Sequence, residues 1–544
     1  MTVVRGAAEV GAGLAPARPE RPIGAGERIH VVGAAGAGAS AAALLAAWAG
    51  ADVDGCDPGG PSSYSPALDA AGIMVWPDHD PAHVAGLRRP ARLAVTKALT
   101  AIDPGNAELA AARTAGIPIE PWQQVVADAA AGRRLVAVAG THGKSTTSGW
   151  LVHVLAAGGL DPGAFVGALL PADLTGTGLR GTARRGAGAP FVVEADEYAG
   201  NFDAYRPEII VLTSAEWDHP DVFADRAAVL DAFEAWIRRA PDGGHGRTPV
   251  LVANVADAGV AELVRRLVGW PGRLVATAVL GGVTPLEDDR KVGGERSAAR
   301  EARAAGERGS DIATGLYTAA GPATALVARI TALEPDGTRL RITGLPGATV
   351  PTDVRLPTAG RHNAANALGV AGAAATLGLA PDAIALGLGS FPGVGRRLER
   401  KGEAAGVVVY DDYGHHPTAI RETLAAVRQR EPGRRVWAVY EPLTYHRTAA
   451  LLEDFAAVLA AADAVAIADI WAGRDPDTTI ASAAGLAAAV AVRNPSIPVS
   501  APGSVEATAR ALAAQVRDGD AVLVMGGGRS YRIGELLLEH LATR

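Results

Sequence analysis

The sequence contains very little cysteine and few aromatic residues. Among 544 residues there is one cysteine, Cys56, and 5% of the residues are aromatic. A single cysteine excludes an intrachain disulfide and any metal site built from several cysteines, and it fits a reducing cytoplasmic setting. With few aromatic rings, the interior must consist mainly of Ala, Val, Leu and Ile, which suits helices packed closely on a sheet.

The chain also lacks a strong charge of one sign and a long apolar run near its start. Its net charge is -7, and arginines alternate with acidic residues. This pattern gives no electrostatic reason to expect a nucleic-acid partner. The first 25 or so residues are rich in Gly, Ala, Pro and Arg and contain no apolar span of about 20 residues, so we expect neither a signal peptide nor a membrane anchor.

Apolar runs alternate with helical patterns, which predicts an α/β fold with mostly parallel sheets. The length suggests roughly three or four domains. We expect a disordered tail at 1–26, a first domain at 27–131, a central domain at 132–392 and a third domain at 393–544. The stretch 282–310, rich in Glu, Asp, Arg, Lys, Gly and Ser, is interpreted as a surface insertion.

Individual elements follow from the same patterns. Buried strands are expected at 52–57, 135–139, 191–193, 209–213, 407–410, 435–440, 464–467 and 521–524. Helices are expected at 40–50, 145–156 and 364–377, and a hairpin at 325–330 and 338–342 around Pro335-Asp-Gly.

A short glycine loop lies between the predicted strand 135–139 and the helix after it. Its residues are Gly140, Thr141, His142, Gly143, Lys144, Ser145 and Thr146. The spacing is GxxGKS, because Val138 stands where a P-loop of the form GxxxxGK[ST] has its first glycine. Such a loop at a helix N-terminus binds phosphate. We predict that Lys144 neutralises the β and γ phosphates of a nucleotide and that the Ser145 hydroxyl reaches Mg²⁺; the alternative is a turn that only starts a helix.

Acidic and histidine residues follow two further predicted strands. Glu194-Ala-Asp-Glu197 comes after the first, and Asp218-His219 follows the second. Ligands gather at the carboxyl ends of strands in an open α/β sheet, and oxygen and imidazole ligands there could complete Mg²⁺ sites. The alternative is a solvated cap or turn.

The first domain carries glycines that suit a bound diphosphate. Gly33, Gly36 and Gly38 follow a predicted strand, and Asp57 ends the next one. The spacing GxxGxG differs from the GxGxxG of dehydrogenases. An NAD-dependent dehydrogenase remains an alternative, but it would leave Lys144 without a role.

Six motifs together resemble the Mur ligase family. They are AVAGTHGKSTT, EADEY, SAEWDHPDVF, GRHNAANAL, FPGVGRRLE and DDYGHHPTAIRETL, in the family's order and spacing, within a similarity that covers roughly residues 28 to 535. The resemblance implies three domains: a Rossmann-like N-terminal domain that binds a UDP-sugar, a central P-loop ATPase-type domain with a parallel sheet, and a Rossmann-like C-terminal α/β domain.

The resemblance also implies roles for individual residues. Lys144 would contact the transferring phosphate, while Ser145, Glu194 and His219 would hold Mg²⁺. The remaining nucleotide contacts would come from His362, Asn363 and Asn366 for adenine, Arg396 and Arg397 for the ATP phosphates, and Asp412 for the ribose. His415 would lie beside the incoming amino acid, and Arg447 would bind its carboxylate. Gly33, Gly36, Ser40, Asp57 and His79 would bind the UDP-sugar.

The implied activity is ATP-dependent amide-bond formation. ATP would phosphorylate the carboxylate of UDP-N-acetylmuramate, and the amine of L-alanine would displace phosphate from the acyl phosphate. Two departures from the family pattern, Glu441-Pro442-Leu443 and Arg529, concern the acceptor amino acid. Another amino acid or a peptide as acceptor, and an inactive relative, therefore stay open. We expect small-molecule partners only and a monomer or weak homodimer.

Overall fold

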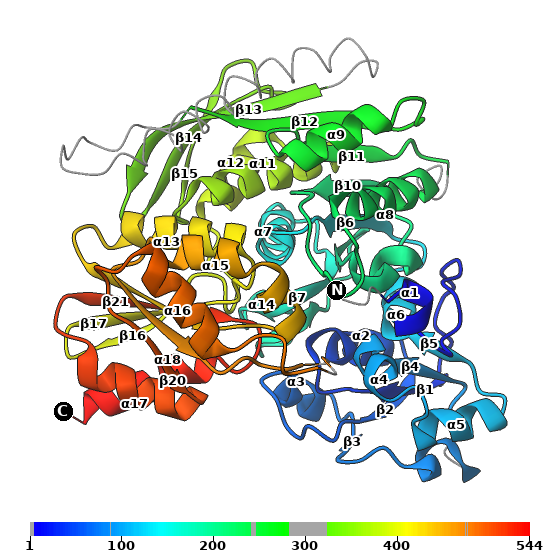
Figure 1. Cartoon of the computed structure of the whole chain (residues 1–544). Helices are drawn as coiled ribbons and strands as arrows, with labels where there is room; N and C mark the ends of the chain where they lie inside the picture. Colours follow the sequence, from blue (N-terminus) through cyan, green and yellow to red (C-terminus); the bar gives the residue numbers. More distant parts are fainter. Residues whose placement is uncertain are drawn as a thin grey trace.

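The computed structural model describes residues 5–86, 89–240, 246–281, 324–473, 475 and 477–543. Within these residues the strands form three sheets, which occupy the blue, cyan-to-green and yellow-to-red parts of the chain in Figure 1. The predicted α/β class is confirmed. The expected insertion at 282–310 lies outside the described residues. No described helix is both long enough and apolar enough to cross a membrane.

The first sheet is parallel throughout and has the order β3-β2-β1-β4-β5. Its strands are β1 (Arg28–Val32), β2 (Asp52–Cys56), β3 (Val75–Trp76), β4 (Arg92–Val95) and β5 (Ile119–Pro121). Its helices are α2 (Ala37–Trp48), α3 (Ser65–Ala70), η1 (Pro81–Val84), α4 (Lys97–Ile102), α5 (Ala107–Thr114) and α6 (Trp122–Ala129). Helix α2 packs closely on α6, since a Cβ atom on Gly38 would lie 2.2 Å from the Trp122 ring.

The central sheet has the order β15-β14-β13-β12-β11-β10-β6-β9-β7-β8 among the described residues. Its strands are β6 (Arg134–Ala139), β7 (Gly163–Leu170), β8 (Gly181–Arg184), β9 (Pro190–Ala195), β10 (Ile209–Leu212), β11 (Val250–Asn254), β12 (Arg273–Leu280), β13 (Thr324–Glu334), β14 (Gly337–Thr343) and β15 (Thr352–Leu356). Its helices are α7 (Lys144–Ala157), η3 (Tyr198–Ala204), α8 (Arg226–Arg239), α9 (Ala258–Arg266), α11 (Arg361–Thr376) and α12 (Pro381–Gly389).

Strand β6 lies between β9 and β10, and both are parallel to it. The segments that follow these three strands therefore meet at one edge of the sheet, as expected for a ligand site in an open α/β sheet. The predicted hairpin is confirmed as the antiparallel pair β13 and β14.

The third sheet has the order β16-β17-β21-β18-β19-β20, with only β16 antiparallel to its neighbour among the described strands. Its strands are β16 (Glu399–Ala404), β17 (Val407–Asp412), β18 (Arg435–Glu441), β19 (Ala464–Ala468), β20 (Val499–Gly503) and β21 (Asp520–Gly526). Its helices are α13 (Pro417–Arg430), α14 (Tyr445–Ala450), α15 (Leu452–Leu459), α16 (Ala483–Arg493), α17 (Val505–Gln515) and α18 (Tyr531–Ala542). The three sheets fall within our predicted domain ranges, whose boundaries remain a proposal.

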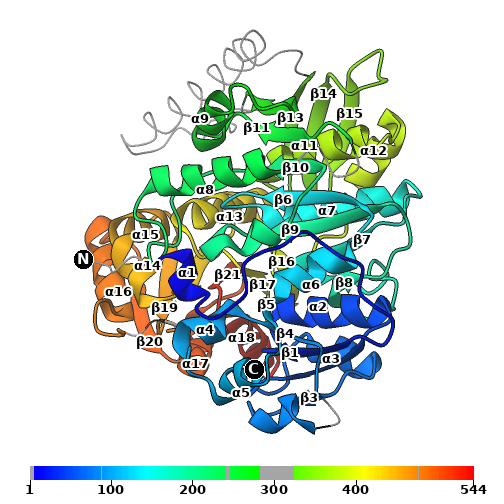
Figure 2. The same cartoon turned by 90° about the vertical axis from the view of Figure 1, so that its right-hand side faces the viewer.

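The N-terminal segment is packed against the rest of the protein, so the predicted disordered tail is wrong for residues 5–26. It begins with α1 (Ala7–Val10) and then runs toward the first domain (Figure 2). Arg18 forms ion pairs with Glu120 at 2.8 Å and with Asp128 at 2.7 Å. These partners lie far along the chain, so the local composition that suggested disorder could not reveal them.

A buried ion pair joins the start of the third domain to its sheet. Asp411, at the end of β17, is fully buried, and its Oδ2 lies 3.3 Å from Nε of Arg396. Burial raises the pKa of Asp411 to about 6, although the positive charge of Arg396 acts in the opposite direction. The folded chain therefore binds a proton here that the unfolded chain releases nearer pH 4.

This raised pKa predicts a pH-dependent difference between the parent and the Asp411→Asn variant. Because the folded pKa exceeds the unfolded one, the contribution of Asp411 to stability is present at low pH and is lost as the pH rises through about 6. From pH 5 to pH 7 the stability of the variant relative to the parent should rise by about 1 kcal/mol. Chemical denaturation at both pH values measures this, with Asp353→Asn, an exposed residue, as control. A difference independent of pH would contradict the assignment.

Candidate active site

The glycine loop after β6 has the tight geometry that its sequence suggested. Gly140 and Gly143 have φ values of 129° and 82°. A Cβ atom on Gly143 would lie 2.6 Å from Oδ1 of Asn366, so a larger residue would collide there. Helix α7 begins at Lys144, and its N-terminus supplies a positive dipole to the pocket.

Lys144 lies between two carboxylates that follow β9. Its Nζ is 2.9 Å from Oε2 of Glu197 and 3.4 Å from Oδ1 of Asp196. Burial alone would lower the pKa of Lys144, but these two carboxylates outweigh it and hold the pKa above its usual value. The ammonium is therefore charged at neutral pH. Oε1 of Glu197 is buried and accepts no hydrogen bond within the described structure, so it is available to a ligand.

Two of the three predicted magnesium ligands are in direct contact. The Ser145 hydroxyl donates to Oε1 of Glu194 at 2.9 Å, and the other oxygen of Glu194 accepts the Gly167 N–H at 2.6 Å. His219 instead belongs with Asp196 and Glu197, whose ligand atoms lie within 4.8 Å of one another. Hydroxyl and carboxylate oxygens are the donors that Mg²⁺ prefers, so the Ser145–Glu194 pair fits this ion, and at the second place the carboxylates of Asp196 and Glu197 offer the oxygen ligands.

The paired arginines point to different places. Nη2 of Arg397 donates to Oγ of Ser145 at 2.7 Å, which brings a cation from the third domain to the glycine loop. Arg396 donates instead to the Gly526 carbonyl and the Ser530 hydroxyl, both at 2.8 Å, and pairs with Asp411. The prediction that both arginines face the ATP phosphates is therefore corrected for Arg396, which holds its own domain together.

The residues expected around the amino acid form one group across two domains. Arg447, on α14, is 4% exposed and donates to Oδ1 of Asp218 at 2.8 Å and approaches Nδ1 of His219 at 3.2 Å. Nδ1 of His415 lies 3.0 Å from the Tyr413 carbonyl. Burial, followed by the charge of Arg447, holds the pKa of His415 well below its usual value, so the ring is neutral at pH 7.

The predicted adenine and ribose residues lie on the same pocket from either side. Asn363 donates to the Ala359 carbonyl at 2.8 Å, and Asn366 donates to Oδ1 of Asn363 at 3.2 Å. His362 lies 3.6 Å from a carboxylate oxygen of Glu422. Asp412 accepts the N–H groups of Leu398 and Gly414 at 2.8 and 2.7 Å. Both its oxygens are thus held in place at the pocket wall.

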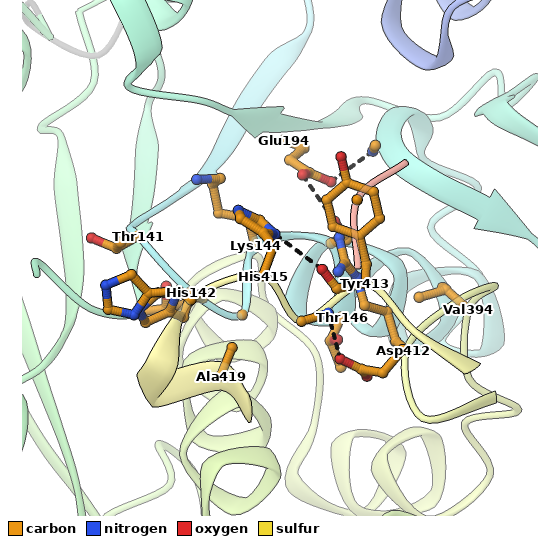
Figure 3. A pocket seen from close by; sticks show the side chains of 18 of the residues that line it. Thr141, His142, Lys144, Thr146, Glu194, Val394, Asp412, Tyr413, His415 and Ala419 are labelled. Atoms are coloured by element: carbon orange, nitrogen blue, oxygen red, sulfur yellow. Dashed lines mark hydrogen bonds between the residues drawn. The ribbon is translucent and has the colours of Figure 1, made fainter. Parts of the chain in front are cut away.

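One large pocket collects most of these side chains. Its volume is about 1690 Å³, larger than the roughly 300–1,000 Å³ usual for one small ligand. Figure 3 shows Lys144 near His415, and Thr146 near Asp412, so loop residues face residues of the third domain across the pocket. The predicted residues on its wall are Asp57, Thr141, His142, Gly143, Lys144, Ser145, Thr146, Glu194, His219, His362, Asn363, Asn366, Arg397, Asp412, His415 and Arg447. Gly33, Gly36, Ser40, His79, Gly140 and Arg396 do not line it.

Of the five first-domain residues predicted to bind the UDP-sugar, Asp57 lines the pocket, whereas Gly33, Gly36, Ser40 and His79 do not. Gly33 has a φ of 82°, and a Cβ atom there would lie 2.6 Å from Thr96. Asp57 accepts the Ala35 N–H at 3.0 Å and so shapes the glycine loop at the pocket edge. Ser40 is buried and donates to the Ala37 carbonyl. His79 lies instead beside Cys56, with Nδ1 3.1 Å from the sulfur. A role for His79 and Ser40 in binding the sugar nucleotide remains a prediction without a pocket contact.

Sequence reasoning missed contacts that join the central and third domains. Oε2 of Glu216 accepts the Thr418 hydroxyl at 2.7 Å and lies 3.2 Å from Nε2 of His142. His416 lies against the His142 ring, with centroids 4.6 Å apart. The pairing of Lys144 with Glu197 was also missed. The motifs EADEY and GHHP contain some of these residues, but no spacing in the sequence indicates which ones meet.

Comparisons with known proteins agree along nearly the whole chain. The model of the Mur ligase family, catalytic domain, matches residues 28–134, and that of the Mur ligase, glutamate ligase domain, matches residues 396–528. The UDP-N-acetylmuramate–L-alanine ligase of Kineococcus radiotolerans is 38% identical over 521 residues, which cover 95% of this chain and 97% of the relative. The corresponding ligase of Frankia casuarinae is 36% identical over 541 residues, covering 95% and 98%.

Solved structures show the same fold. The UDP-N-acetylmuramate–alanine ligase of Thermotoga maritima has a TM-score of 0.70 at 21% identity, covering 95% of this chain and 99% of that one. A murein peptide ligase of Psychrobacter arcticus has a TM-score of 0.66 at 23% identity, with the same coverage. Together with sequence identities above one third over 95% of the chain, these likenesses show that the protein belongs to the Mur ligase family.

Proposed function

We propose that the protein joins L-alanine to the carboxylate of UDP-N-acetylmuramate, with ATP converted to ADP and phosphate. The observation that carries this proposal is the convergence of Lys144, the Ser145–Glu194 pair and Arg397 at the start of α7. The curated relatives named above carry this activity in their names. The reaction would supply a precursor of peptidoglycan.

In the first step, a carboxylate oxygen of the sugar nucleotide attacks the γ-phosphorus of ATP, and ADP leaves. Lys144, Arg397 and the N-terminus of α7 neutralise negative charge on the phosphates. Ser145 and Glu194 would hold Mg²⁺, with His219 at the neighbouring carboxylates; this ion would supply further charge neutralisation. The side chains of Asn363 and Asn366 would bind adenine beneath the loop.

In the second step, the amine of the acceptor attacks the acyl carbon. The carbon–nitrogen bond forms, the bond from carbon to the phosphoryl oxygen breaks, and phosphate leaves while the amine loses a proton. The neutral ring of His415 would lie beside the acceptor, but its lowered pKa makes it a weak base, so the proton passes to solvent. Arg447 would bind the acceptor carboxylate through two hydrogen bonds, exchanging part of its present pairing with Asp218.

Several alternatives fit the molecule less well. An NAD-dependent dehydrogenase gives no role to Lys144 and its carboxylates, and an inactive scaffold gives no reason for the Ser145–Glu194 contact. A peptide acceptor stays as the second candidate because Leu443 lines the third-domain side of the pocket in place of the family's usual histidine. We further propose a cytoplasmic location, where ATP is available, and a monomer or weak homodimer.

The proposal predicts a specific substrate requirement. With ATP, Mg²⁺ and UDP-N-acetylmuramate, phosphate release should be fastest with L-alanine among the twenty amino acids and should exceed that with an L-alanyl peptide. A colorimetric phosphate assay measures this, with reactions lacking the sugar nucleotide as control. Equal or faster release with the peptide would favour a recycling ligase, and no release with any acceptor would contradict the proposal.

Removing the ammonium of Lys144 should stop the first step selectively. We expect Lys144→Ala to lower ADP formation by at least about 10²-fold, because a positioned charge that stabilises the transition state is lost. UDP-N-acetylmuramate binding, measured by calorimetry, should change little, because Asp57 and the first glycine loop belong to another sheet. Lys401→Ala, whose side chain pairs with Glu535 on the third domain, is the matched control. Parallel loss of sugar-nucleotide affinity would contradict the assignment.

A further inference from the structure

A further cluster of side chains that could hold a metal ion lies in the first domain, away from the pocket. It contains His30 on β1, Cys56 on β2, His83 on η1 and Glu108 on α5. Cys56 and Glu108 are fully buried, and His30 is 1% exposed. None of the four lines the large pocket, so the proposed ligase chemistry does not use them.

Several of the ligand atoms lie about as far apart as the ligands of one zinc ion, with the two oxygens of Glu108 facing different partners. Nε2 of His30 lies 2.8 Å from Oε1 of Glu108 and 3.4 Å from Sγ of Cys56. Sγ of Cys56 lies 3.2 Å from Oε2 of Glu108, and Nδ1 of His83 lies 3.2 Å from Oε1 of Glu108. Tetrahedral zinc with bonds of about 2.0–2.3 Å has ligand-to-ligand distances of about 3.3–3.6 Å. All four ligand atoms lie within 4.8 Å of one another, so small adjustments complete the geometry.

We propose that His30, Cys56, His83 and Glu108 bind one structural zinc ion. One sulfur, two imidazole nitrogens and one carboxylate oxygen are ligands that Zn²⁺ accepts, and four protein ligands give the closed coordination of a structural site. Mg²⁺ and Ca²⁺ prefer sites made of oxygen alone. The single cysteine excluded only a metal site built from several cysteines. This ligand set contains one cysteine, so it is compatible with that exclusion.

The surroundings of the histidines favour the same conclusion. Nδ1 of His30, the nitrogen that faces away from the cluster, lies 2.6 Å from Oδ1 of Asp54. Histidines that bind metals usually donate their other N–H to a carboxylate or carbonyl in this way. The Trp76 ring stacks on His83, with centroids 4.6 Å apart and planes inclined by 19°, and so fixes the imidazole.

The competing explanation is a hydrogen-bonded cluster without metal. Burial alone would lower the pKa of His30, but hydrogen bonds and charge from Asp54 and Glu108 outweigh it and raise the pKa to about 9. The cluster would then hold an imidazolium and a neutral thiol. On zinc binding, the Cys56 thiol and one His30 nitrogen would each release a proton to solvent, so charge stays balanced.

A zinc ion here would brace the loop expected to hold the UDP diphosphate. The carbonyl of Cys56 accepts the N–H groups of Gly33 and Ala34 at 2.8 and 3.1 Å. Fixing the Cys56 side chain therefore also fixes the strand end on which the glycine loop rests. The zinc ion would have a structural role, so this inference does not depend on which substrate the protein uses.

Cobalt(II) provides the sharpest test, because Cys56 is the only cysteine in the chain. A thiolate-to-cobalt charge-transfer band in the near ultraviolet can therefore arise only at this cluster. After treatment with chelator and a phosphine reductant, titration with cobalt(II) should produce the band with one equivalent of metal, and zinc(II) should abolish it. Zinc should also raise the midpoint of thermal unfolding.

Variants decide which side chains bind the ion. Cys56→Ser should remove the band, and His83→Ala should weaken metal binding at least tenfold. His153→Ala is the matched control, since His153 contacts Ser390 in the central domain and should leave the titration unchanged. Absence of the band in the parent protein at saturating cobalt, or an unchanged titration in His83→Ala, would overturn the proposal. The parent measurement remains decisive even if a variant fails to fold.

Discussion

The partly buried pairing of Lys144 with Glu197 and Asp196 is the interaction on which the central site depends. An ammonium group withdrawn from water is costly unless it is paired, and here two carboxylates after β9 hold it at the start of α7. This fixes the position of the cation before a nucleotide arrives. In the proposed reaction, phosphate binding would exchange one set of negative partners for another, which costs less reorganisation than ordering a free lysine.

The same site is completed from the third domain. Arg397 contacts Ser145, Arg447 contacts Asp218, and Thr418 contacts Glu216. Each contact joins a segment that follows a strand of the central sheet to a segment of the third domain. The central and third domains are therefore in contact in this structure. The charges that would face ATP and the acceptor amino acid come from both sides of one pocket.

The sequence predicted those parts whose geometry is local. Strand, loop and helix around Lys144 are adjacent in the chain, and the two glycines allow the positive-φ turn that the loop needs, so the loop was predictable. The contacts of Arg396 could not be predicted. Arg396 and Arg397 are adjacent and carry the same charge, so only the folded structure shows which of them faces Ser145. Order in residues 5–26 and the His30–Cys56–His83–Glu108 cluster likewise depend on contacts between distant segments.

The central claim is that this protein makes a carboxylate reactive by transferring a phosphoryl group to it. The most direct measurement follows oxygen: UDP-N-acetylmuramate with an ¹⁸O-labelled carboxylate is incubated with ATP, Mg²⁺, L-alanine and the protein, and the released phosphate is analysed by mass spectrometry. If an acyl phosphate forms, each phosphate released carries one oxygen from the labelled carboxylate. Phosphate without the label, formed alongside the amide product, would contradict the account.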